Sequence, residues 1–91
     1  MKVVLTEAAR LDLMSQIDWL VRLSPAAARK AADRIESGLL RLADFPLSGP
    51  PQHSGFREAR IRFGRDGFVV RYHVEGDAVV ILRLFHGRQE R

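Results

Sequence analysis

Apolar residues recur at helical spacing near the start of the chain. Intervals of four, four and three residues separate Ala9, Leu13, Ile17 and Leu20. This spacing predicts one buried helical face. Thr6 supplies an N-cap hydroxyl, and Glu7 places an acid in the first turn, where the helix dipole favours it. We therefore expect a helix from about Glu7 to Arg22.

A second helical pattern follows directly. Ser24 is a suitable N-cap, and Pro25 occupies the first helical position, where its missing N–H has no cost. The second apolar stripe consists of Ala28, Ala31, Ile35, Leu39 and Leu42. Phe45-Pro46 ends this helix, because a residue before proline avoids the helical region. The small residues at its start favour close packing, so the two helices are expected to form an antiparallel hairpin.

The rest of the chain is patterned as strands. "KVVL" (2–5) is short and β-branched, and from Phe56 onward apolar and charged residues alternate with a period of two. Asp66-Gly67 is a strong hairpin turn signal, and the run 78–86 is apolar on both faces except at Arg83, which is typical of a central strand. The predicted fold class is α+β in the order β-α-α-β-β-β, with a helix hairpin packed on a mainly antiparallel four-stranded sheet. We expect a single domain, with a helical half (1–45), a loop (46–55), a β-meander (56–86) and a C-terminal tail (87–91).

The composition of the chain excludes several kinds of functional site. The 91 residues contain no cysteine, which excludes disulfides, thiolate metal sites and cysteine nucleophiles. The three histidines, His53, His73 and His86, lack a metal-ligand spacing, so neither a metal nor a cofactor is expected. No apolar run approaches the roughly 20 residues of a membrane helix, and no signal segment is evident, so we expect a cytoplasmic protein without a membrane partner.

Basic charge is concentrated in the second part of the chain. The formal net charge is +4 and the sequence pI is about 10.6, which points to an acidic partner. Residues 56–91 hold eight arginines against five acids, and no lysine. Arginine is suited to bidentate contacts with carboxylate or phosphate. Arg60, Arg62 and Arg71 either form a solvated sheet face or bind a target. Arg83 either pairs with Glu58, Glu75 or Asp77 or contributes to a site, with Ile81 and Phe85 expected beside it on one face.

Several segments together resemble the RelE/ParE toxin superfamily. They are the helix hairpin, the exit "LADFPLSGPP" and the closing stretch "FVVRYHVEGDAVVILRLFHGRQER". The resemblance spans nearly the whole chain and is closer to the ParE branch. It implies the toxin of a type II toxin–antitoxin pair, with growth arrest as its effect and plasmid or chromosome stability as its setting. The implied partner is an acidic, partly disordered, ParD-like antitoxin, through which the toxin associates indirectly with DNA.

The resemblance leaves two targets open. The ParE branch is associated with inhibition of DNA gyrase, and the RelE branch with ribosome-dependent cleavage of mRNA. Cleavage through the RNA 2′-hydroxyl needs a proton acceptor and an acid beside the phosphate. The RelE branch is known for lysines, arginines and a tyrosine near the C-terminus. Here the lysines are Lys2 and Lys30, and the only tyrosine, Tyr72, falls on a predicted core face.

The candidate site residues follow from these alternatives. If the protein is an RNase, His86 is the only candidate proton acceptor near the end of the chain. If it is a binding inhibitor, no catalytic residue is needed. The target-binding candidates are then Arg60, Arg62, Arg71, Arg83, His86 and Arg88. Trp19 falls off the main stripe of the first helix and either packs on the second helix or anchors the antitoxin. A third possibility is a basic binding domain without toxicity.

Overall fold

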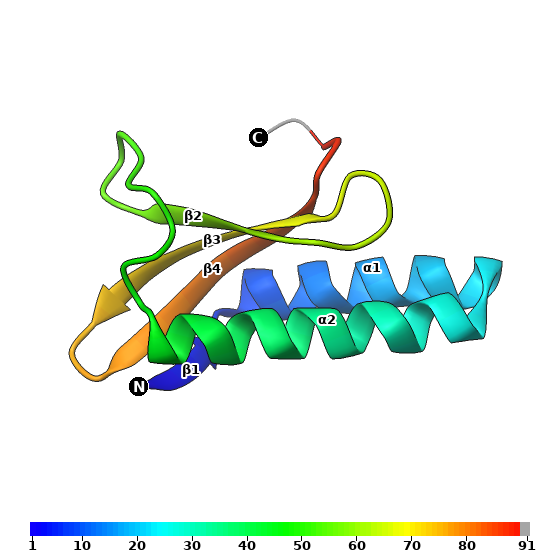
Figure 1. Cartoon of the computed structure of the whole chain (residues 1–91), viewed down its shortest axis with the longest axis horizontal. Helices are drawn as coiled ribbons and strands as arrows, with labels where there is room; N and C mark the ends of the chain where they lie inside the picture. Colours follow the sequence, from blue (N-terminus) through cyan, green and yellow to red (C-terminus); the bar gives the residue numbers. More distant parts are fainter. Residues whose placement is uncertain (90–91) are drawn as a thin grey trace.

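The computed structural model describes residues 1–89 and confirms the predicted order and fold class. The last two residues of the predicted tail 87–91 lie outside the described residues. The elements are β1 (Lys2–Leu5), α1 (Glu7–Leu23), α2 (Pro25–Asp44), β2 (Arg57–Ile61), β3 (Phe68–Glu75) and β4 (Ala78–His86). Both helices lie on the same side of the sheet, and the described end of the C-terminal tail lies on the other (Figure 1).

The four strands form one mixed sheet in the order β1-β4-β3-β2. β4 pairs with β3 in antiparallel and with β1 in parallel, so the most apolar strand is central, as its pattern predicts. Among the strands of residues 1–89, β2 pairs with β3 alone and so lies at the edge of the sheet, with a further bridge between its Arg57 and Pro51 of the preceding loop. The alternation that begins at Phe56 is regular strand only from Arg57 to Ile61, and Phe63, which follows the strand, still packs against the core.

The helices begin where their capping residues predict. The Thr6 hydroxyl accepts a hydrogen bond from the Ala9 N–H at 3.1 Å. The Ser24 hydroxyl does the same for Ala27 at 3.2 Å, with Pro25 at the first helical position. The helical stripes meet apolar residues of β2, β3 and β4 in one core cluster, whose largest fully buried side chains are Tyr72, Phe68 and Ile81. No helix within residues 1–89 has the length and apolar character required to cross a bilayer.

A β-bulge in β4 changes which residues share a face. Arg71 pairs with Arg83, but the next residue, Tyr72, pairs with Ile81, so Leu82 has no partner on β3. Because an extra residue reverses the alternation, Ile81 faces the helices whereas Arg83 does not. The expectation that Ile81 and Arg83 lie on one face was therefore wrong, although Arg83 does lie near Phe85.

Helix α1 closes the edge of β4 beyond the end of β1. The Thr6 N–H donates to the Ile81 carbonyl at 3.0 Å, and the Thr6 hydroxyl donates to the Leu82 carbonyl at 2.9 Å. Further along α1, the Asp12 carboxylate accepts a hydrogen bond from the Leu84 N–H at 2.9 Å. Backbone groups of β4 that β1 is too short to pair are thus satisfied by the backbone and side chain of Thr6 and by the side chain of Asp12.

The loop between α2 and β2 is fixed by Tyr72. The Tyr72 side chain is fully buried, and its hydroxyl donates to the Pro46 carbonyl at 2.8 Å. The same hydroxyl accepts from the Gly49 N–H at 2.9 Å. A Cβ at Gly49 would lie 2.8 Å from both this hydroxyl and the Glu58 carbonyl, so the close approach requires glycine. The loop is therefore held against the end of β2.

Candidate functional site

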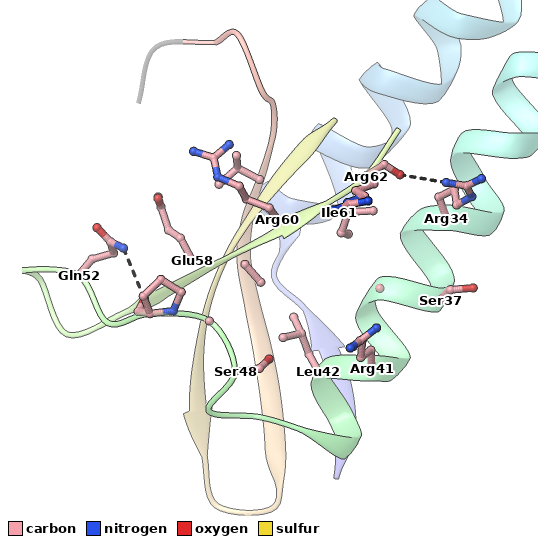
Figure 2. Close-up of a pocket in the computed structure, with 15 residues that line it drawn as sticks. Arg34, Ser37, Arg41, Leu42, Ser48, Gln52, Glu58, Arg60, Ile61 and Arg62 are labelled. Carbon is pink, nitrogen blue, oxygen red and sulfur yellow. Dashed lines mark hydrogen bonds between the residues drawn. The ribbon is translucent and has the colours of Figure 1, made fainter. Parts of the chain in front are cut away.

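A groove of about 680 Å³ runs along the outer edge of β2. Its walls are α2 on one side and the segment Ser48–Gln52 on the other, as Figure 2 shows. Its floor includes the apolar side chains of Leu42, Ala59 and Ile61. Gly38 of α2 faces Ile61, and a Cβ there would lie 2.7 Å from the Ile61 side chain, so helix and strand approach closely at this point. The groove is thus formed by backbone elements that pack tightly at its base.

Four arginines line this groove. Arg34 and Arg41 extend from α2, and Arg60 and Arg62 extend from or follow β2. The Arg34 guanidinium donates to the Arg62 carbonyl at 3.4 Å. Among residues 1–89, no carboxylate forms an ion pair with any of the four. The groove is therefore lined by four arginines and one acid, Glu58, whose carboxylate pairs with Arg71.

Arg71 belongs to a different cluster, on the sheet face away from the helices. Its guanidinium donates twice to one Glu58 carboxylate oxygen, at 3.2 and 3.3 Å. It also lies 4.3 Å from the ring centroid of Phe56 and 5.1 Å from that of Phe85. Both charged side chains are largely shielded, with 24% and 15% of their surface exposed for Arg71 and Glu58. Arg71 thus holds strands β2, β3 and β4 together on this face.

Arg83 pairs with Asp12, a residue of α1. The expected partners, Glu58, Glu75 and Asp77, were wrong, because the bulge turns Arg83 toward the edge that α1 covers. The guanidinium donates to the two Asp12 oxygens at 2.7 and 3.0 Å. These hydrogen bonds, followed by the one from the Leu84 N–H, hold the pKa of Asp12 below its ordinary value, although partial burial opposes this. The same hydrogen bonds and the charge of Asp12 raise the pKa of Arg83.

His86 lies on the helix side of the sheet, away from Arg71 and Arg83, and its Nδ1 accepts a hydrogen bond from the Arg88 N–H at 3.3 Å. Its ring makes an edge contact with the buried Phe68 ring, with 6.3 Å between centroids. It lines a cavity of about 120 Å³ together with Trp19 of α1, whose surface is 53% exposed.

The described C-terminal tail contacts the turn between β2 and β3. Arg88 lies 3.6 Å from the Asp66 carboxylate, and the Gly87 N–H donates to the Gly67 carbonyl at 2.9 Å. The described tail is therefore docked on the β2–β3 turn.

The structure separates the predicted site residues into three places. Arg60 and Arg62 line the groove, Arg71 and Arg83 are bound in ion pairs, and His86, Arg88 and Trp19 cluster at the end of β4. Sequence reasoning missed Arg34 and Arg41 as groove residues. Their spacing of seven residues, which places both on one side of a helix, was the available signal.

Comparison with known proteins identifies the protein family to which this chain is similar. Residues 3–91 match the family described as the ParE toxin of the type II toxin-antitoxin system, parDE. Toxin RelE3 of Caulobacter vibrioides is 39% identical over 91% of this chain and 90% of its own length. Toxin RelE1 of the same organism is 33% identical over 98% of this chain and 96% of its own.

A solved structure agrees with this match. The structure titled "Chromosomal ParDE TA system from P. aeruginosa" contains a chain with a TM-score of 0.76 and 28% identity. The alignment covers 94% of this chain and 95% of the other. The relatives named RelE and the family model named ParE both fall within the superfamily that the sequence resembles. This chain therefore belongs to the ParE toxin family and is a toxin of a type II toxin–antitoxin system.

Proposed function

We propose that this toxin acts in the cytoplasm by binding and inhibiting DNA gyrase, without a reaction of its own, and that a ParD-like antitoxin neutralises it. The observation that carries the proposal is the separation of His86 from the groove arginines and from Arg71 and Arg83; the target-binding candidate beside it, Arg88, lies 3.6 Å from the Asp66 carboxylate. A nuclease of this kind needs a proton acceptor next to cationic groups around one phosphate. In the described residues, His86 contacts Phe68 on the helix side, whereas Arg71 lies on the opposite face.

The other groups that could assist RNA cleavage are also engaged. The Tyr72 hydroxyl is buried and makes two hydrogen bonds to the loop, so it is not available to a substrate. Arg71 and Arg83 are held by Glu58 and Asp12. Arginine remains protonated at physiological pH and does not serve as a base. Inhibition by contact requires only surface charge and shape, and the groove arginines, which form no ion pair with an acid among residues 1–89, supply the charge.

A supercoiling assay with purified gyrase, relaxed plasmid and purified toxin tests this proposal. We expect loss of supercoiling that depends on toxin concentration and is reversed by the co-expressed antitoxin. Undisturbed gyrase turnover at a toxin concentration that arrests growth would contradict it.

The alternative function is a RelE-like, ribosome-dependent mRNA interferase, favoured by the names of the two Caulobacter relatives. Primer extension on ribosome-bound message would then show discrete cuts, and His86→Ala would abolish them. The gyrase reaction would be unaffected in that case, so the two assays together separate the functions. Overexpression without slower growth would exclude both in favour of a binding domain without toxicity.

A further inference from the structure

We propose that the cavity between α1 and the β2–β3 turn binds an aromatic ring that carries a carboxylate on a short spacer, with the ring inside the cavity and the carboxylate at Arg65. The cavity has a volume of about 120 Å³ and shares no lining residue with the groove beside β2. Its lining includes Trp19, Leu20, Phe63, Arg65, Phe68 and His86. The inference is independent of the proposed function, because it involves neither gyrase nor the antitoxin.

Aromatic rings from separate elements line the cavity. The Phe63 and Phe68 rings are stacked, with 5.5 Å between their centroids and 23° between their planes. The His86 ring meets the Phe68 ring edge-on at 6.3 Å, and Trp19 completes the lining from α1. Aromatic rings pair favourably in these two arrangements, and a dry cavity of about 150 Å³ holds benzene. A ligand ring of benzene size therefore matches this space in size and in chemistry.

The described tail holds the cavity in shape. The Gln16 side-chain amide donates to the Gln89 amide oxygen at 3.0 Å, which joins α1 to the tail. The Gln89 N–H donates to the His86 carbonyl at 3.0 Å, and the Gly87 N–H donates to the Gly67 carbonyl at 2.9 Å. In Figure 1 the β2–β3 turn, in yellow, accordingly lies beside the end of β4 and over α1. Since these hydrogen bonds connect all three elements around the cavity, a ligand does not have to order them on binding.

The polar groups of the lining are mainly hydrogen-bond donors. The Trp19 indole N–H and the Arg65 guanidinium have no hydrogen-bond or ion-pair partner within residues 1–89. The Nδ1 of His86 accepts a hydrogen bond from the Arg88 N–H at 3.3 Å, so the neutral ring carries its proton on Nε2, which is a third donor. A carboxylate only accepts hydrogen bonds and thus complements such a set.

The charge of the lining selects an anion over a cation. Asp66 is the one carboxylate among the lining residues, and it lies 3.6 Å from the Arg88 guanidinium. Two guanidinium groups, Arg65 and Arg88, against this one carboxylate leave a net charge of +1 with His86 neutral. Aromatic walls beside an acid would otherwise suit an organic cation. Here Arg88 of the tail already pairs with the acid that such a cation needs.

The test uses Trp19, the only tryptophan of the chain, as a fluorescent reporter of the cavity. The full purified toxin is titrated with phenylpropionate, phenylpropanol and phenylpropylamine, which share a ring and spacer and differ in charge. We expect saturable changes in fluorescence, with the acid binding roughly three- to fivefold more tightly than the alcohol and the amine binding most weakly.

Substitution of Arg65 separates the charge from the cavity. Arg65 is exposed in the turn, and Arg65→Gln should lower the affinity for the acid to that for the alcohol while leaving the alcohol unaffected. The matched control, Arg29→Gln, removes the same charge from an exposed position of α2 outside the cavity. It should bind all three compounds within about twofold of the unmodified toxin.

Three results would overturn the proposal. The first is tighter binding of the amine than of the acid, or equal binding of all three compounds. The second is an Arg65→Gln variant that weakens the alcohol as much as the acid, because the loss would then be structural. The third is the absence of any change in Trp19 fluorescence and in the chemical shift of its indole N–H at millimolar ligand.

A ring with a carboxylate has two sources, a free aromatic acid or a phenylalanine next to a glutamate in a protein. The blocked dipeptide N-acetyl-phenylalanyl-glutamate amide carries both groups on a peptide backbone. Tighter binding of this dipeptide than of phenylpropionate assigns the site to a protein segment. Binding of phenylpropionate alone assigns it to a free acid. The gyrase assay is independent of both results, so failure of one proposal leaves the other in place.

Discussion

Removing one hydroxyl from the core should loosen the loop that forms a wall of the groove. In Tyr72→Phe, the Gly49 N–H and the Pro46 carbonyl both lose their partner. Gly49 is buried, so its unpaired N–H costs about 1–3 kcal/mol, whereas the half-buried Pro46 carbonyl can regain water and costs about 0.5–1.5 kcal/mol. The expected loss in the free energy of unfolding is therefore about 2–4 kcal/mol. For a domain of this size it lowers Tm by roughly 10–25 °C.

Urea unfolding followed by circular dichroism measures this loss, with an unchanged m-value as the sign that the same structure unfolds. The matched control is Ser37→Ala, which removes an exposed hydroxyl from another wall of the groove and should change stability by less than about 0.5 kcal/mol. If Tyr72→Phe lowers the free energy of unfolding as little as this control does, the Tyr72 hydroxyl does not hold the loop.

Three further changes test other contacts. Because the pKa of Asp12 is depressed by folding, its stabilisation is present above the ordinary aspartate pKa of about 3.9 and is lost as pH falls through the folded value. Asp12→Asn should therefore be less stable than the unmodified protein at neutral pH, and the urea midpoints of the two proteins should converge in acid. A difference between the midpoints that does not change with pH would contradict a stabilising ion pair between Asp12 and Arg83. Gly38→Ala gains about 1 kcal/mol of helix propensity but overlaps the Ile61 side chain, so a net loss of up to about 2 kcal/mol is expected. The loss in the free energy of unfolding caused by Gly38→Ala should be smaller in a protein that also carries Ile61→Val. If the effects of the two substitutions are additive, the two side chains do not overlap. Arg71→Lys keeps the charge but loses the planar contacts with the aromatic rings of Phe56 and Phe85. Thermal unfolding should show a free energy of unfolding that is lower by about 1–2 kcal/mol, whereas Arg60→Lys should leave it almost unchanged.

The parts of the fold that follow from local pattern were predictable from sequence. Both helices begin at the predicted residues, because a cap and a 3.6-residue stripe are properties of adjacent residues. The central place of β4 in the sheet was also predictable, since the most apolar strand needs neighbours on both sides. The bulge at Leu82 was not, because it depends on how β3 and β4 align, and an unbroken apolar run carries no register signal.

The candidate site was predictable only in part, for a related reason. The contact between Asp12 and Arg83 joins residues 71 positions apart, and neither residue is unusual in its own helix or strand. Reasoning within the β-meander therefore assigned Arg83 the wrong acids. Arg34 and Arg41 lie on the polar side of α2, where charged residues need no explanation until the fold brings them beside β2.

The arginines of this toxin divide into structural and available groups. Arg71 and Arg83 lie over aromatic rings and pair with acids, so they stabilise the sheet whether or not a partner is present. Arg34 and Arg60 pair with no described acid, and their side chains line the groove beside β2. Because no ion pair within residues 1–89 involves Arg34 or Arg60, charge reversal at the groove should change binding with little effect on unfolding. Substitution of the paired arginines should do the opposite, and that difference would locate the binding surface without knowledge of the target.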